Sequence, residues 1–264
     1  MVVAPAPSQS DGVAVRLRGV SKTYDNGVAA LGPVDLEVSR AEFVSLLGPS
    51  GCGKSTALRL IAGLSAASSG VVEVSGRQAR KKSIGFVFQE PTLMPWTSVR
   101  ENVRLPLKLA HTPRDQAEAR VGEALAQVGL SEFADAYPRE LSGGMKMRVS
   151  LARALVTDPD ILLMDEPFAA LDEITRFRLN NDLLAVWRNL HKTVIFVTHS
   201  VFESVYLSQR VIVMTPRPGR IDGEFRINSA EPRTEAFRTS GEYAAHCRDV
   251  SIALARASGE KLAS

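Results

Sequence analysis

The sequence has little cysteine, little net charge and no long hydrophobic run, and each shortage excludes a class of protein. Its 264 residues include two cysteines, Cys52 and Cys247. So few cysteines do not build a disulfide framework, and we expect free thiols in a reducing compartment. No apolar run approaches the roughly 20 residues of a membrane-spanning helix. The strongest runs, at residues 194–197 and 211–214, are short and typical of buried strands.

The formal net charge of +3 is too small to indicate a nucleic-acid partner by itself. With 45% hydrophobic and 23% charged residues, the composition is typical of a globular protein. The length suits one large domain, or one domain with an inserted subdomain. Residues 1–12 lack a basic start and a sustained apolar core, so we expect a flexible tail and not a signal peptide.

The order of the apolar runs predicts an α/β fold with a parallel sheet. From residue 42 onward, short apolar runs alternate with helical patterns, which is typical of strands joined by crossover helices. Two earlier segments alternate apolar and polar residues and favour an antiparallel lobe. The lobe segments are 13–17 and 34–38, and the other expected strands are 42–47, 71–74, 84–88, 161–164, 194–198 and 211–214.

Between residues 90 and 158 helical patterns replace strand patterns, which predicts an inserted helical subdomain. The turn-rich segment "TPRPGRIDG" predicts a final hairpin. We therefore expect a main domain at 13–230 and a partly helical tail at 231–264. The expected helices are 56–64, 114–128, 142–156, 174–190 and 243–254.

The segment "GPSGCGKST" has the G-x-x-x-x-G-K-[ST] spacing of a phosphate-binding loop. It follows a predicted strand and precedes a predicted helix, as such a loop requires. Glycines let backbone N–H groups surround phosphate oxygens, Lys54 adds a positive charge, and the Ser55 hydroxyl is an oxygen ligand for Mg²⁺. The alternative is a glycine-rich turn with a chance lysine. The predicted nucleotide-binding residues are Gly48, Pro49, Ser50, Gly51, Cys52, Gly53, Lys54, Ser55 and Thr56.

The segment "ILLMDEP" is a predicted buried strand that ends in two acids. An acid at a strand end beside a phosphate loop can hold Mg²⁺ through water, and Asp165 suits that role. Glu166 should lie on the other side of the pleat, where it could orient or deprotonate an attacking water. Alone, the pair could simply cap the next helix. Together with the phosphate loop it predicts a nucleotide triphosphatase, and the lack of an N-K-x-D motif favours ATP.

Three single residues add weaker signals. Tyr24 offers a flat ring for adenine, and on spacing alone a half-buried strand tyrosine is an equal alternative. His199 ends "TVIFVTH" and could hydrogen-bond a γ-phosphate, although a lone strand-end histidine is usually structural. Gln89 ends "IGFVFQ", and its amide could touch both a metal and a water.

A second glycine-rich segment, "LSGGMKMRVSLARAL", opens a predicted helix. A helix start with bare N–H groups suits an anion, and Ser142 with Gly143 and Gly144 would suit a γ-phosphate. By itself the segment is better explained as a plain N-cap followed by glycines.

Six motifs in a fixed order make the chain resemble the nucleotide-binding subunit of ATP-binding cassette (ABC) transporters. They are "GPSGCGKST", "FVFQEPTLMPW", "LSGGM", "ILLMDEP", "AALD" and "VTHS", and the resemblance covers residues 13–227. It implies a P-loop NTPase fold, with a RecA-like parallel sheet, an antiparallel β lobe and a helical subdomain, and it implies ATP and Mg²⁺ as ligands.

The resemblance also assigns roles to the residues named above. Glu166, His199 and Gln89 are implied to be catalytic, Ser55, Gln89 and Asp165 to hold the metal, and Tyr24 to stack on adenine. Two cassettes of the family pair head to tail, so Ser142, Gly143 and Gly144 are implied to bind the partner's nucleotide, with Asp172 at the end of the D-loop. Met145 and Met147 replace two usual glutamines, and neither change removes the serine or the glycines. Ala169 replaces a common serine, which affects hydrogen bonds of the implied interface and not the mechanism.

"EPTLMPWTSVRENV" follows Gln89, and in related importers this region receives a helix of the permease. On composition alone, Trp96 fits such docking and the core of the helical subdomain equally well. Longer segments resemble the nitrate/sulfonate/taurine importer group, which also carries pyrimidine-type vitamin precursors. The resemblance thus implies a bacterial importer subunit, peripheral on the cytoplasmic face of the inner membrane. It implies a permease, a second cassette and a solute-binding protein as partners, and no nucleic acid.

Three alternatives stay open. A soluble cassette that acts on RNA or DNA would find support in the basic cluster Arg77, Arg80, Lys81 and Lys82, which is more simply a solvated loop. An exporter subunit shares the same motifs. A regulatory module without turnover would not need the intact set Lys54, Asp165, Glu166 and His199.

Overall fold

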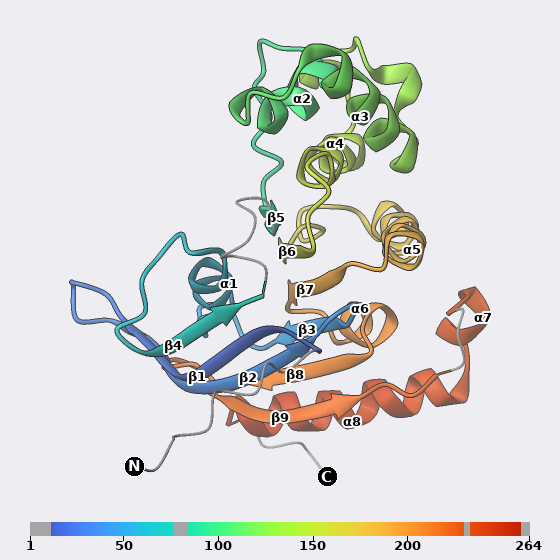
Figure 1. The fold of residues 1–264 in the computed structure, drawn as a ribbon. Helices are drawn as coiled ribbons and strands as arrows, with labels where there is room; N and C mark the ends of the chain where they lie inside the picture. Colours follow the sequence, from blue (N-terminus) through green and yellow to red (C-terminus); the bar gives the residue numbers. More distant parts are fainter. Residues whose placement is uncertain (1–11, 76–83, 230–232, 260–264) are drawn as a thin grey trace, which may run out of the picture.

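A computed structural model describes residues 12–75, 84–229 and 233–259. Within these ranges a six-stranded sheet has the order β5-β6-β7-β3-β8-β9, parallel except for β9, which pairs antiparallel with β8 (Figure 1). The strands are β3 (Phe43–Leu47), β5 (Ile84–Val87), β6 (Ile161–Asp165), β7 (Thr193–Thr198), β8 (Arg210–Met214) and β9 (Ile221–Arg226). The predicted parallel sheet and final hairpin are confirmed.

A second, antiparallel sheet has the order β2-β1-β4 among the described residues. Its strands are β1 (Val13–Thr23), β2 (Ala29–Ser39) and β4 (Ser69–Val74). Both β1 and β2 extend well beyond the predicted 13–17 and 34–38. Register shifts between Leu17 and Val20 and between Val20 and Lys22 interrupt the alternation of side chains, so the sequence pattern revealed only part of each strand.

The parallel sheet is buried on both faces because alternate residues of its strands enter two separate cores. On β3, Phe43 and Leu47 enter one core, and Val44 and Leu46 enter the other. The second core also contains α1 (Lys54–Ala62) and the antiparallel sheet. The first core contains residues of α4 (Gly143–Leu155), α5 (Glu173–Leu190), α6 (Val201–Leu207) and α8 (Gly241–Ala257). This two-sided burial explains why the strands are continuous apolar runs.

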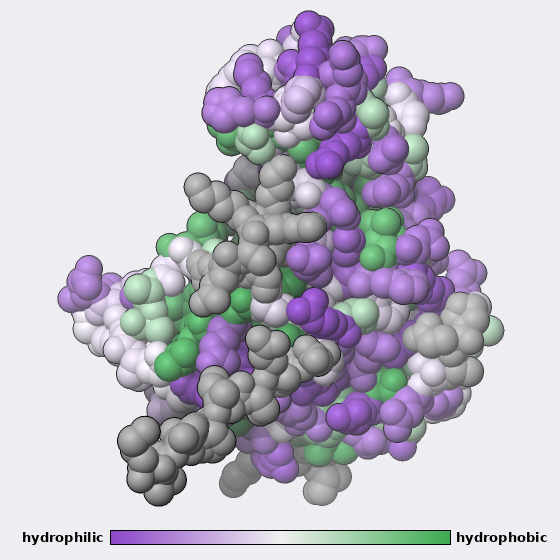
Figure 2. Space-filling model, viewed as in Figure 1, coloured by the Kyte–Doolittle hydropathy of each residue, from purple (hydrophilic) through white to green (hydrophobic). Residues whose placement is uncertain are grey.

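Helices α2 (Val99–Leu109), α3 (Arg114–Gln127) and α4 gather at one end of the molecule, away from the antiparallel sheet (Figure 1). Short 3-10 turns, η1 (Ser131–Phe133) and η2 (Pro138–Glu140), connect α3 to α4. On the face shown in Figure 2, hydrophilic residues cover most of this group. The predicted helix at 114–128 is confirmed, and the boundaries of the predicted domains stay predictions.

Near the C-terminus, α8 includes the predicted helix at 243–254, and α7 (Glu235–Arg238) precedes it. None of the helices in the described ranges is both long enough and apolar enough to cross a membrane. Cys52 and Cys247 are free and buried. Residues 1–11 of the predicted tail, and Arg77, Arg80, Lys81 and Lys82 of the basic cluster, lie outside the described residues.

Candidate functional site

The loop between β3 and α1 has a backbone that only glycine adopts easily. Gly53 has a φ of 104°, and a Cβ on it would lie 2.5 Å from the carbonyl oxygen of Ala30. Gly51 has a φ of 74°. No side chain caps the start of α1. The first N–H groups of this helix are therefore available to an anion.

Lys54 lies inside the loop and is almost fully buried. Its ammonium donates hydrogen bonds to the carbonyl oxygens of Gly48 at 2.8 Å and Pro49 at 3.0 Å. The same nitrogen lies 3.7 Å from Oε1 of Glu166. The loop thus holds a positive charge beside its own carbonyls and next to the acid that follows β6.

Ser55 and Asp165 join the loop to the end of β6. The Ser55 hydroxyl donates to Oδ1 of Asp165 at 2.7 Å. Burial raises the pKa of the Asp165 carboxyl, and the hydrogen bond from Ser55 partly opposes this shift. The Ser55 hydroxyl and the Asp165 carboxyl therefore lie in contact at the edge of the sheet where the carboxyl ends of β3 and β6 are found.

Glu166 follows β6 in a left-handed conformation, with a φ of 45°. Its backbone N–H donates to the carbonyl oxygen of Val197 on β7, at 3.0 Å. The expected alternation of the pleat does not apply here, because the residue has left the strand. Its Oε2 lies 3.4 Å from Nδ1 of His199, whose side chain is 52% exposed. Glu166 thus lies between Lys54 and His199.

Tyr24 lies just past the end of β1, so it is not a strand tyrosine. Its hydroxyl is 3.3 Å from the Thr56 hydroxyl, and the ammonium of Lys22 lies 5.3 Å from the ring centroid. Gln89 is exposed, two residues beyond β5, and β5 pairs with the strand that carries Asp165. Tyr24 therefore contacts the end of the loop, and the implied role of Gln89 stays a prediction.

The second glycine-rich segment lies on a different element. Ser142 caps α4 and accepts a hydrogen bond from the backbone of Met145 at 3.3 Å. Ser142 and Gly143 are exposed, whereas a Cβ on Gly144 would meet Thr175 at 2.7 Å. Within the described residues, no hydrogen bond or ion pair joins this segment to residues 48–56.

Asp172 caps α5 by accepting a hydrogen bond from the backbone of Thr175 at 2.9 Å. This bond lowers the pKa of its carboxyl. Asp172 is therefore the N-cap of α5, and its implied place beside a partner's nucleotide stays a prediction.

Sequence reasoning missed two residues that pack on the phosphate loop. Arg217 donates a hydrogen bond to the carbonyl oxygen of Gly51 at 3.2 Å, and a Cβ on Gly219 would overlap the carbonyl oxygen of Cys52. Both lie in "TPRPGRIDG", whose turn signals predict a hairpin and carry no information about what the hairpin touches.

Sequence reasoning also missed the residues that hold the segment after Gln89. Asn102 is fully buried, accepts from the backbone N–H of Met94 and donates to the carbonyl oxygen of Thr97. Arg153 on α4 donates to the carbonyl oxygens of Pro91 and Thr92. Trp96, between these anchors, is 74% exposed. Its interpretation as subdomain core is therefore excluded.

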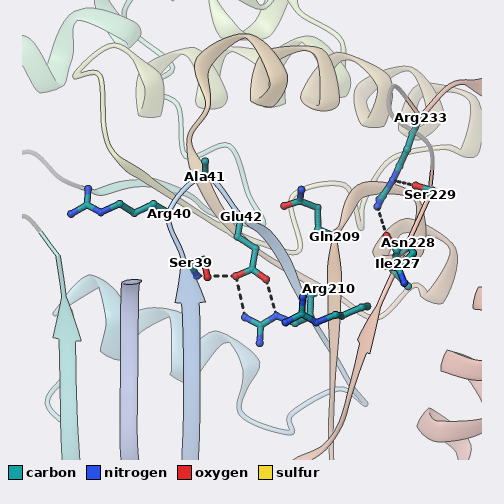
Figure 3. Close-up of a pocket in the computed structure, with 11 residues that line it drawn as sticks. Ser39, Arg40, Ala41, Glu42, Gln209, Arg210, Ile227, Asn228, Ser229 and Arg233 are labelled. Carbon is teal, nitrogen blue, oxygen red and sulfur yellow. Dashed lines mark hydrogen bonds and ion pairs between the residues drawn. The ribbon is translucent and has the colours of Figure 1, made fainter. Parts of the chain in front are cut away.

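A different cavity, of about 480 Å³, lies at the opposite edge of the sheet (Figure 3). It opens at the amino ends of β3 and β8, whereas the phosphate loop lies at the carboxyl end of β3. Glu42 accepts two hydrogen bonds from the Arg210 guanidinium there, at 2.8 and 3.1 Å. This ion pair lines the cavity, and none of the site residues named above is among the lining residues.

Comparisons with known proteins agree on one family. The family model described as ABC transporter matches residues 31–169. An uncharacterized ABC transporter ATP-binding protein of Methanocaldococcus jannaschii is 47% identical, over 88% of this chain and 87% of that protein. A taurine import ATP-binding protein of Rhizobium johnstonii is 48% identical, over 78% of this chain and 79% of that protein.

Two solved structures have the same fold. One is a dimeric ATP-binding cassette in a post-hydrolysis state with ADP and Pi; it is 34% identical, has a TM-score of 0.72, and the match covers 82% of this chain and 100% of that chain. The other, from Clostridium perfringens, is part of an ABC transporter complex; it is 28% identical, has a TM-score of 0.75, and the match covers 93% of this chain and 97% of that chain.

Proposed function

The chain belongs to the ABC transporter family and is an ATP-binding, ATP-hydrolysing cassette, and on that premise we propose that it powers the uptake of a small solute through a separate permease. The import ATP-binding proteins among the relatives support the uptake, and the cluster of Lys54, Glu166 and His199 at the carboxyl edge of the sheet supports the hydrolysis that powers it. This cluster places a cation, an acid and an imidazole where a triphosphate would lie.

The chemistry of the cluster follows from its contacts. Binding of the triphosphate would exchange the two carbonyl hydrogen bonds of Lys54 for contacts with phosphate oxygens. Glu166 would then orient or deprotonate the attacking water, and His199 would hydrogen-bond the γ-phosphate. Tyr24, next to Thr56, would stack on the adenine. These roles suit a site whose acid is already oriented by two neighbours.

Mg²⁺ suits the oxygen groups at this edge. The Ser55 hydroxyl and the Asp165 carboxylate are hard oxygen donors in contact with each other, and Gln89 adds an amide oxygen near the same edge. Ser55 would hold the ion directly, and Asp165 and Gln89 directly or through water. When bound, the ion neutralises phosphate charge during the transfer.

We propose that the nucleotide is completed by a second copy of the chain. Ser142 and Gly143 are exposed at the start of α4, and within the described residues no hydrogen bond or ion pair joins them to the phosphate loop of their own chain. A helix start with free N–H groups suits the γ-phosphate of a facing subunit. Dimeric cassettes among the relatives support this arrangement, in which Asp172 would lie near the same interface.

Trp96 is the proposed contact with the permease. Its ring is exposed, and Asn102 and Arg153 fix the backbone on both sides of it. An exposed aromatic on a rigid loop is well suited to dock a partner helix. The loop begins at Gln89, so ATP binding at one end and the permease at the other would be linked. The protein would then lie on the cytoplasmic face of the membrane.

For the solute we propose a sulfonate such as taurine. Relatives with 48% and 43% identity are taurine import ATP-binding proteins, and one with 41% identity is an aliphatic sulfonates import ATP-binding protein. Nitrate and a pyrimidine-type precursor are the alternatives within the resembling group. A solute-binding protein would complete the complex.

The test is purification of the tagged chain from detergent-solubilised membranes, followed by mass spectrometry. We expect one multi-span protein per cassette, and loss of that protein in Trp96→Ala but not in the control Ile252→Ala, which removes an exposed side chain from α8. The isolated Trp96→Ala subunit should hydrolyse ATP normally. Recovery of ribosomes or DNA without a membrane protein would refute the transporter proposal, and would favour the soluble alternative.

A further inference from the structure

A cavity of about 320 Å³ lies between α5, α6 and the C-terminal helices α7 and α8. Its walls include Arg176 and Asn180 from α5, Glu203 from α6, and Arg238 and Tyr243 from α7 and α8. A volume of this size lies within the range of small-molecule sites. None of the roles proposed above involves these residues.

Four polar atoms of these walls are buried without a hydrogen-bond partner among the described residues. They are the donors Arg176 Nε and Arg238 Nη2, and the acceptors Asn180 Oδ1 and Glu203 Oε1. Asn180 is 1% exposed and Glu203 is 8% exposed. Buried polar groups are normally paired, because burial removes their hydrogen bonds to water. Arg176 Nε and Glu203 Oε1 form an ion pair at 3.7 Å, which is too long for a hydrogen bond. Arg238 Nη2 and Asn180 Oδ1 have no such partner among the described residues, which indicates that something else satisfies them.

The guanidinium of Arg238 is fixed in place by aromatic rings. It lies 4.2 Å from the ring centroid of Phe177 and 3.8 Å from that of Tyr206. Its unpaired nitrogen is therefore held at the cavity and not free to turn toward solvent. Phe177 and Phe202 also line the cavity and add apolar surface.

We propose that this cavity binds a small molecule with an anionic group, an N–H donor and a flat apolar body. The anionic group would accept from Arg238, and the N–H group would donate to Asn180. Either group could also insert into the long ion pair between Arg176 and Glu203. The apolar body would lie against the phenylalanines. With a liquid-water share of about 30 Å³ per molecule, the cavity has room for about ten non-hydrogen atoms.

The cavity is linked to the nucleotide site through Glu203. Its Oε2 accepts from the Thr198 hydroxyl at 2.6 Å, and the same hydroxyl accepts from the backbone N–H of Ser200 at 3.0 Å. His199 lies between these two residues, 3.4 Å from Glu166. A ligand that engages Glu203 would therefore act on the turn that presents His199. This coupling, unlike the binding itself, rests on the proposed role of His199.

The first experiment measures binding of 4-aminobenzoate to the full chain by titration calorimetry, without nucleotide. This probe has a carboxylate, an amine, a flat ring and about ten non-hydrogen atoms, so we expect a dissociation constant on the order of 1 mM. Benzoate lacks the N–H donor and should bind about tenfold more weakly.

Arg238→Met and Asn180→Leu should each weaken binding of the probe about tenfold, because each removes a charged or polar partner. The control Arg248→Met removes an exposed arginine of α8 and should bind like the original chain. If Arg238→Met does not fold, Asn180→Leu decides. Equal binding by all variants, or no binding at all, would refute the site and leave water as its occupant.

The second experiment measures ATP turnover at saturating 4-aminobenzoate. We expect the turnover rate to change about twofold or more in the original chain and not in Asn180→Leu. Unchanged turnover with intact binding would refute the coupling. Since the first experiment involves neither ATP nor a membrane partner, its result does not depend on the proposed transport function.

Discussion

Glu166 combines an uncommon backbone conformation with a side chain that lies between Lys54 and His199. Its left-handed backbone is an uncommon conformation for a residue other than glycine, and the hydrogen bond to Val197 holds it. The carboxylate lies near Lys54 on one side and His199 on the other. A strained backbone at the end of a strand indicates that the direction of this side chain is required for function.

Glu166→Gln should bind ATP normally but lose turnover by about 100-fold or more, because the amide keeps the size of the side chain and cannot accept a proton. Bound ATP would then accumulate in closed dimers. Turnover and light scattering at saturating Mg²⁺ and ATP would measure this. Glu132→Gln, an exposed change far from the site, is the control. A variant that stays monomeric with ATP would contradict the proposed dimer.

Glu203 gives a prediction about pH. Burial is the main cause that raises the pKa of its carboxyl above the ordinary 4.5. The folded state then holds more protons than the unfolded state between the two pKa values, so stability falls as pH rises through that window. Glu203→Gln is neutral throughout. Its thermal midpoint should exceed that of the original chain at neutral pH, and this advantage should shrink as the pH is lowered toward 4.5. A lower midpoint at neutral pH would show that the ion pair with Arg176 outweighs the burial.

At the scale of elements, the start of α1 depends on one glycine. Gly53→Ala would place a Cβ against the carbonyl of Ala30, in a backbone conformation that alanine avoids. We expect a loss of about 1–3 kcal/mol in the free energy of unfolding and a clear loss of ATP affinity. Urea titration and nucleotide titration would measure the two effects.

A matched control lies in α3. A Cβ on Gly122 would meet open space, and the residue sits inside a helix. Gly122→Ala should therefore stabilise the protein by about 0.5–1 kcal/mol and leave ATP affinity unchanged. If both alanine variants behaved alike, the conformation of the phosphate loop would not be the cause.

The elements that the sequence predicted best are those whose pattern is local and strong. The short apolar runs of β6, β7 and β8 predicted strands, and the long pattern of α3 predicted a helix, and the structure confirms both. Helix α6 was missed because its seven residues, Val201–Leu207, are too short for a periodic pattern. The bulges of β1 hid half of that strand. The contacts of Arg217, Asn102 and Arg153 depend on segments far apart in the chain, so no local pattern could reveal them.

At the scale of the whole molecule, each nucleotide should need one phosphate loop and one α4 start from different chains. Lys54→Ala removes the first and Ser142→Arg blocks the second, so each variant alone should be nearly inactive. A mixed dimer contains one chain of each variant. One of its sites combines the altered phosphate loop with the altered α4 start, and the other site combines the two unaltered elements. Random mixing makes about half of the dimers mixed, so we expect about a quarter of the original turnover.

The control for this experiment is each variant mixed with itself. Ser142→Arg should still bind ATP at its own phosphate loop, which a nucleotide titration would check. If mixing restored no activity while both variants bound each other, the α4 start would not act on the partner's nucleotide.

The place of β3 in the sheet has a consequence for how the protein is made. Phe43 pairs with Val194 and Val44 pairs with Arg210, so both neighbours of this early strand come from the last third of the chain. During synthesis β3 leaves the ribosome long before either neighbour exists. Its two edges, and the face that carries Phe43 and Leu47, stay uncovered until then, and such strands are prone to aggregation. Fragments that stop before β7 should therefore be insoluble, and recovery of the full chain should depend on chaperones that shield the early strand.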